Sequence, residues 1–71
     1  MGTGRITCWD ASKKEGAIKP RNAVNFHRLF RKSGTIGQLR ADLDAGKDPT
    51  DAKVTYEVDR PKRATDVAYA S

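Results

Sequence analysis

The sequence predicts an all-β fold, a small barrel of five short antiparallel strands with one short helix between the third and fourth strands. Segments of strand character alternate with turn residues over positions 4–29. A helical pattern interrupts them once, at about 36–45, and clean strand alternation resumes after it. This order of three strands, a helix and two strands is typical of an OB-type Greek-key barrel.

The first two predicted strands are Arg5–Trp9 and Gly16–Lys19, and the charged residues 10–15 join them as a hairpin loop. Strands this short and this close in sequence are expected to pair antiparallel. A parallel pair would need a connection of about a dozen residues or more.

Simple alternation predicts which side chains of these two strands are buried. It directs Ile6 and Ile18 into the core. It places Cys8 on the same face as Ile6 and turns Trp9 outward, unless a bulge shifts the pattern.

The third predicted strand is Ala23–Leu29, which follows a turn that contains Pro20. Its alternation assigns Val24 and Phe26 to the core. The next residues, 30–34, are expected to form a basic connection rather than a strand.

A short helix is predicted at about 36–45. Thr35 is a suitable N-cap, and Gln38 follows at the spacing of a capping box. Gly46 is suited to end the helix. The apolar side chains recur at helical intervals and are expected to close one end of the barrel: Ile36, Leu39 and Leu43.

The last two predicted strands are Ala52–Asp59 and Ala64–Ala70, after a turn at 47–51. The first of them alternates most cleanly in the chain. The alternation groups these apolar side chains on the inner faces: Val54, Tyr56 and Val58 in one strand, Val67 and Tyr69 in the other.

Length and charge limit the class of protein. The 71 residues are expected to form one domain, 1–71, with a thin core. The formal net charge is +5, with 14 Lys and Arg against nine Asp and Glu. Such a balance favours a polyanionic partner, although a charge of this size also keeps small proteins soluble.

One cysteine, Cys8, excludes an internal disulfide and favours a reducing compartment. No apolar run is long enough to span a membrane, and no secretory signal is apparent, so a cytoplasmic monomer is expected.

The segment Gly4 to Pro20 resembles the opening of bacterial cold-shock domains. These residues match that family's pattern in register: Gly4, Ile6, Trp9, Asp10, Ala11, Lys13, Gly16, Ile18 and Pro20. Similar short matches occur at 24–28, 54–57 and 64–67. The resemblance implies an OB barrel that binds single-stranded RNA or DNA by stacking bases on aromatic side chains within a basic rim.

The chain departs from the family at most of the stacking positions. Non-aromatic residues occupy them: Cys8, Glu15, Ala17, Asn25 and Arg28. We therefore expect binding led by charge, with Trp9 and His27 as a reduced stacking platform. Arginine can also stack on bases, so Arg28 is a possible replacement for an aromatic ring.

The predicted nucleic-acid-binding residues are Trp9, Lys13, Lys19, Arg21, Asn25, His27, Arg28, Arg31, Lys62 and Arg63. An alternative stays open for each of them: Trp9 could cover the barrel edge, His27 could be solvated, and the cations could form a solvated basic face. A second reading of the whole chain is a barrel scaffold that binds a protein, as a small regulator or inhibitor of transcription or RNA processing.

No enzymatic activity, cofactor or metal is expected. Cys8 and His27 lack an orienting third group, and His27 has no Cys or His companion at metal-ligand spacing. The hairpin loop has a single glycine and lacks the Walker spacing, so it is not a phosphate-cradling loop.

Overall fold

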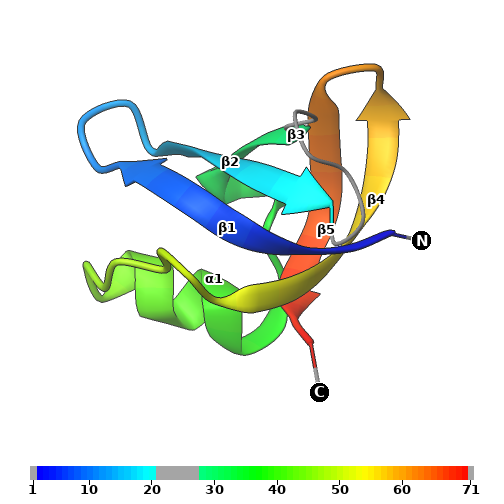
Figure 1. Cartoon of the computed structure of the whole chain (residues 1–71). Helices are drawn as coiled ribbons and strands as arrows, with labels where there is room; N and C mark the ends of the chain where they lie inside the picture. The colour runs from blue at the N-terminus through cyan, green and yellow to red at the C-terminus, as the bar shows by residue number, and fades with distance from the viewer. Residues whose placement is uncertain (1, 21–27, 71) are drawn as a thin grey trace.

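The computed structural model describes residues 2–20 and 28–70, and its elements follow the predicted order. The strands are β1 Gly2–Asp10, β2 Glu15–Pro20, β3 Arg28–Arg31, β4 Lys53–Arg60 and β5 Arg63–Tyr69. Between β3 and β4 lie a 3-10 helix, η1 Lys32–Gly34, and an α-helix, α1 Gly37–Asp44 (Figure 1). The prediction of three strands, a helix and two further strands is confirmed.

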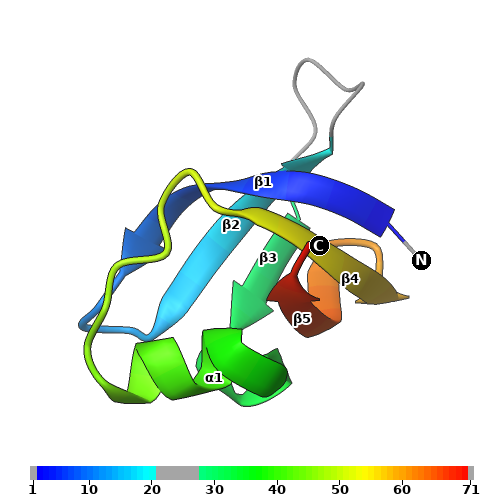
Figure 2. The ribbon, with the colours of Figure 1, turned by 90° about the horizontal axis from the view of Figure 1, so that it is seen from below.

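The strands form one mixed sheet that closes into a barrel-like ring. Their order is β1-β2-β3-β5-β4, and β4 pairs back onto β1 through contacts such as Gly4 opposite Val54. Figure 2 shows α1 lying against one end of this ring. Every strand and α1 contribute to one buried core: Ile6, Ile18, Phe30, Leu39, Leu43, Val54, Tyr56, Ala64 and Val67.

The prediction of a purely antiparallel sheet is wrong for one pairing. β3 and β5 run parallel, with Leu29 opposite Arg63 and Phe30 opposite Ala64. Residues 32–62 lie between these strands and supply the long connection that a parallel pair requires. The other four pairings are antiparallel.

A register shift in β1 reverses the predicted sides of Cys8 and Trp9. Ile6 pairs with Ile18, but Cys8 already pairs with Ala17, so one extra residue is inserted between them. Cys8 is consequently exposed, and Trp9 is half-buried and packs against the core.

β3 lies further along the chain than predicted. It spans Arg28–Arg31, and Phe30, which was expected in a connection, is fully buried in the core. The two residues predicted as the core of this strand, Val24 and Phe26, lie outside the described residues.

The helix is confirmed at Gly37–Asp44, with Leu39 and Leu43 buried. Its predicted start is wrong. The N-cap is Ile36, which is 48% exposed and whose backbone N–H donates to the Val67 carbonyl. The Thr35 hydroxyl donates to the Lys32 carbonyl instead of capping α1. Gly46, at φ +83°, follows the helix as predicted.

Irregular pairing between β4 and β5 changes two predicted inner faces. Val54 and Tyr56 are buried, but Val58 is 46% exposed because the ladder shifts register at two places. In β5 a positive φ of 52° at Asp66 lets both Ala64 and Val67 turn inward.

Candidate nucleic-acid interface

The β4–β5 turn and β3 lie side by side and enclose a groove of about 310 Å³, the β3 groove. Four of its seven described lining residues are cations, and the lining comes from β2, β3, β4, β5 and the β4–β5 turn: Glu15, Leu29, Phe30, Arg31, Arg60, Lys62 and Arg63. Three of the predicted binding residues, Arg31, Lys62 and Arg63, therefore meet in one place. A concave surface with four cations and one carboxylate is suited to bind an anion.

Backbone and side-chain hydrogen bonds hold the β4–β5 turn against β3. The Leu29 N–H donates to the Lys62 carbonyl at 2.9 Å. The Arg28 guanidinium donates from Nη1 to the Pro61 carbonyl. Arg28, predicted to present its side chain to a nucleic acid, is thus engaged in fixing the turn that carries Lys62.

Arg31 connects the β3 groove with a second hollow beside the β1–β2 loop, the hairpin groove. Its lining is Lys13, Lys14, Arg31, Lys32, Ser33 and Arg40. Arg31 itself pairs with Glu15 across β2 and β3, with 3.4 Å between Nε and Oε1. Because the Arg31 side chain is 65% exposed and the Glu15 side chain 37% exposed, water screens this pair, which is therefore weak and leaves Arg31 able to exchange partners.

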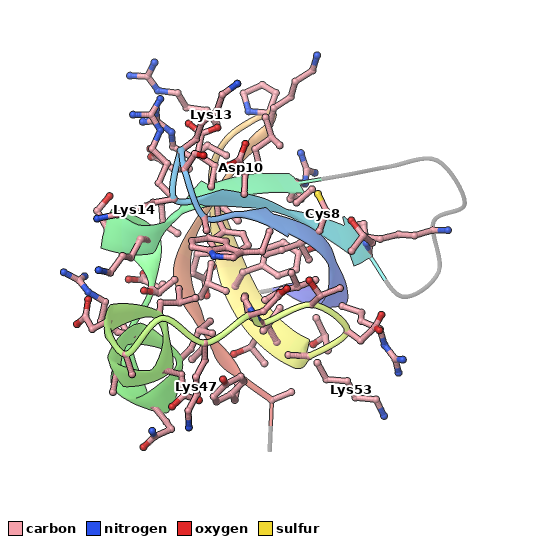
Figure 3. The ribbon with its side chains drawn as sticks, turned by 90° about the vertical axis from the view of Figure 1, so that its left-hand side faces the viewer. Cys8, Asp10, Lys13, Lys14, Lys47 and Lys53 are labelled. Atoms are coloured by element: carbon pink, nitrogen blue, oxygen red, sulfur yellow. The ribbon has the colours of Figure 1, made fainter. Side chains whose placement is uncertain are left out.

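The β1–β2 loop has a defined shape that directs Lys13 outward. The Asp10 carboxylate accepts hydrogen bonds from the backbone N–H groups of Ser12 and Lys13, at 2.9 and 3.2 Å. Lys14 has φ 56°, and its carbonyl accepts from the N–H of Lys32 at 3.0 Å. Figure 3 shows Lys13 and Lys14 on the outside of the loop.

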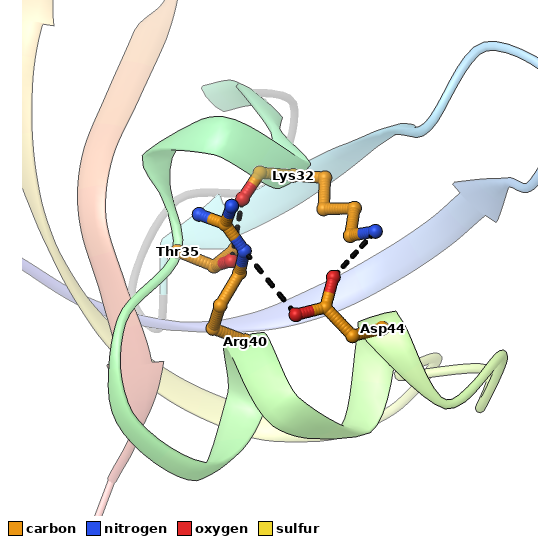
Figure 4. A network of polar contacts seen from close by, with 4 residues as sticks. All are labelled: Lys32, Thr35, Arg40 and Asp44. Carbon is orange, nitrogen blue, oxygen red and sulfur yellow. Dashed lines mark hydrogen bonds and ion pairs between the residues drawn. The ribbon is translucent and has the colours of Figure 1, made fainter.

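Two cations of the hairpin groove share one carboxylate, which offsets one of their two positive charges. Asp44 pairs with Lys32 Nζ at 2.5 Å and with Arg40 Nε at 3.7 Å (Figure 4). The hydrogen bond from Lys32 is the main reason why the pKa of the Asp44 carboxyl lies below its usual value. Lys13, Lys14 and Arg31 therefore carry most of the positive charge that this groove offers to a ligand.

Trp9 packs against Phe30, with ring centroids 5.7 Å apart and 22° between the planes. Trp9 therefore covers the edge of the barrel-like ring and packs against the core. Its role in base stacking stays a prediction.

One further predicted residue is not in this cluster. Lys19 lines a separate groove beside β1 and β4. The predicted residues Arg21, Asn25 and His27 lie outside the described residues.

The structure adds residues that were not among the predicted binding residues, Leu29 and Arg40 among them. Leu29 is 50% exposed within the β3 groove, and Arg40 lies at the hairpin groove. Leu29 directly precedes Phe30, whose side chain points inward from β3. Alternation along the strand therefore indicates weakly that Leu29 lies on the outer face. Arg40 carried no such signal, because its position depends on how α1 docks.

Within residues 2–20 and 28–70, no group of three or more His, Cys, Asp or Glu side chains could hold a metal ion. No helix in this described part is long and apolar enough to cross a membrane. Comparison with protein-family models and with curated protein sequences gave no match. The resemblance to cold-shock domains therefore stays a prediction.

Proposed function

We propose that this protein binds single-stranded RNA or DNA without catalysing a reaction, and that its barrel is a cold-shock-like OB fold. The observation that carries the proposal is the β3 groove, where Arg31, Arg60, Lys62 and Arg63 line one hollow. Such a groove suits a phosphodiester backbone, because each cation can contact one phosphate. The ring order and the two loops that border β3 support the OB assignment, since OB folds bind oligonucleotides with this part of the barrel.

Charge rather than stacking is proposed to supply most of the affinity. Three neighbouring positions on the outer face of the sheet, Cys8, Ala17 and Leu29, pair with one another across β1, β2 and β3. None of them carries an aromatic ring on which a base could stack. Without several contacts of roughly 1–3 kcal/mol each, binding should be weak and strongly dependent on salt.

The test is a fluorescence-anisotropy titration of labelled oligo-dT and oligo-U at about 50 mM and about 200 mM salt. The double variant Lys62→Gln/Arg63→Gln removes two cations of the β3 groove. The salt slope should fall by about 1.4, because each lost contact to a single strand contributes about 0.7.

Lys47→Glu is the control, because it changes the net charge by the same amount and Lys47 lies outside both grooves. It should bind nearly as well as the unmodified chain. The proposal would be refuted if the protein bound neither oligo-dT nor oligo-U at the lower salt concentration.

A second candidate function is protein binding by the same barrel. The half-exposed Leu29 within a ring of cations also fits an acidic peptide that carries an apolar side chain. A pull-down from lysate, repeated after nuclease treatment, separates the two. Partners that survive the nuclease favour protein binding, and partners that disappear favour nucleic acid.

A further inference from the structure

Three cations form a row across the outer face of three adjacent strands, and none of them lines the β3 groove. Lys19 of β2 pairs with Arg5 of β1, and Arg5 pairs in turn with Lys53 of β4. We call Lys19, Arg5 and Lys53 the cation row.

The alternation of the strands directs all three side chains outward. The residues next to them in sequence, Ile6, Ile18 and Val54, are fully buried. Successive side chains of a strand point to opposite faces, so the cation row lies on the solvent side of the sheet. Since neighbouring strands are about 4.8 Å apart, the row extends over about 10 Å.

The row borders a groove of its own, with a volume of about 540 Å³. The described part of its lining contains no carboxylate: Thr3, Gly4, Arg5, Thr7, Lys19, Pro20 and Lys53. This groove shares no residue with the β3 groove or the hairpin groove. In Figure 3, Lys53 lies on the opposite side of the ring from Lys13.

The fold itself gains nothing from this arrangement. Like charges directly opposite one another in adjacent strands are destabilising. Among the described residues, none of the acidic side chains forms an ion pair with a member of the row. A bound anion would remove the repulsion, so the row is suited to a polyanion with closely spaced negative charges.

We propose that the cation row is a second phosphate-binding surface, which holds the backbone of the same single-stranded nucleic acid after it leaves the β3 groove. This inference rests on the proposed function. The molecule measures 30 × 25 × 21 Å, so a strand that reaches both surfaces must pass around the barrel. A short oligonucleotide can occupy the β3 groove alone, whereas a longer one can contact both surfaces.

The test compares the salt dependence of binding for oligo-dT of roughly six and roughly 20 nucleotides, because one OB fold binds roughly 4–16 nucleotides and the longer strand exceeds that range. The variant Arg5→Gln/Lys53→Gln should leave the affinity for the short oligonucleotide unchanged within about twofold. For the long oligonucleotide it should lower the salt slope by about 1.4, the value for two lost phosphate contacts. Lys62→Gln/Arg63→Gln should weaken the binding of both oligonucleotides, and Lys47→Glu should weaken the binding of neither.

The inference would be overturned if Arg5→Gln/Lys53→Gln bound the long oligonucleotide with the same affinity and the same salt slope as the unmodified chain. Equal weakening of both lengths would also overturn it, because the row would then act only through the overall charge. Inorganic polyphosphate is tested as a second polyanion. If Arg5→Gln/Lys53→Gln no longer binds polyphosphate but binds the long oligonucleotide as the unmodified chain does, the inference is overturned and the row is assigned to another polyanion. If the unmodified chain binds neither length, the proposed function fails and the inference fails with it.

Discussion

Trp9 and Phe30 come from different strands and stack over Gly16, which separates them in the sheet. Trp9 and Phe30 both pair with Gly16, one from β1 and the other from β3. The rings can meet at a centroid distance of 5.7 Å because Gly16 has no side chain between them. This contact links β1 to β3 across β2.

Gly16→Ala is expected to destabilise the protein by about 1–3 kcal/mol, the usual cost of overpacking a core. A Cβ at this position would lie 2.7 Å from Phe30 Cε1 and 2.9 Å from the Cys8 carbonyl oxygen. Urea denaturation, followed by the fluorescence of the single tryptophan, measures the effect.

Gly34→Ala is the matched control, because its Cβ would approach no described atom closer than 3.4 Å. It should change the free energy of unfolding by less than about 0.5 kcal/mol. Equal stability of the two variants would contradict the packing of Trp9 and Phe30 over Gly16.

Arg28→Lys is expected to destabilise the protein by about 1 kcal/mol and to weaken oligonucleotide binding, although it keeps the charge. The compact ammonium of a lysine cannot reproduce the planar guanidinium whose Nη1 donates to the Pro61 carbonyl. The β4–β5 turn, which carries Lys62, would then be less firmly fixed to β3.

Arg31→Lys serves as the comparison, since Arg31 lies on the same strand and its pairing with Glu15 is exposed. Its stability should change by less than about 0.5 kcal/mol. Thermal denaturation and anisotropy titration of both variants check the prediction. A larger loss of stability in Arg31→Lys than in Arg28→Lys would contradict it.

The hydrogen bond from Tyr69 to Asp42 predicts a stability that falls at both ends of the pH scale. The Tyr69 hydroxyl donates to Asp42 Oδ2 at 2.6 Å and links β5 to α1. This bond lowers the pKa of Asp42 below its usual value of 3.8, and it raises the pKa of Tyr69 from 10.0 to about 12.

Each pKa shift sets the pH range in which the bond contributes. The lowered pKa of Asp42 gives stability that is present above pH 3.8 and is lost as the pH falls further. The raised pKa of Tyr69 gives stability that is present below pH 10.0 and is lost as the pH rises to about 12. Tyr69→Phe should therefore have a lower melting temperature near neutral pH and a flatter pH profile at both ends. Parallel profiles of the two proteins would show that the bond does not contribute.

Local patterns in the sequence were sufficient for the parts of the fold that obey simple alternation. Ile6, Ile18 and Val54 follow the period of two, and Leu39 and Leu43 follow the helical period; all are buried as predicted. The prediction was wrong where an extra residue or a positive φ interrupts the period. Cys8 and Trp9 follow the irregular pairing in β1. In β5, Val67 is buried as predicted, but Ala64 is buried with it and Tyr69 is 37% exposed, because Asp66 at φ 52° interrupts the alternation.

The candidate site could be predicted only in part, for a related reason. Lys62 and Arg63 are neighbours in the chain, so the sequence shows directly that their charges are close. Arg31 reaches them only because β3 pairs with β5, with Leu29 opposite Arg63. Pairing between strands so far apart in the sequence is a property of the whole barrel, and no local pattern encodes it.

Glu15→Gln is expected to strengthen oligonucleotide binding by roughly two- to fivefold, the range for one exposed charge interaction. Glu15 is the only carboxylate in the described lining of the β3 groove, and it pairs with Arg31 at 3.4 Å. Its removal frees Arg31 for a phosphate and removes a repulsive charge. The salt slope should become steeper by about 0.7, the value for one additional contact.

Asp51→Asn is the matched control, because it removes the same charge at a position outside the grooves described above. Asparagine also tolerates the positive φ of 70° at this residue. Anisotropy titrations at two salt concentrations should separate a local effect from a general one. An equal gain in both variants would mean that only the net charge matters and that the β3 groove is not where the nucleic acid binds.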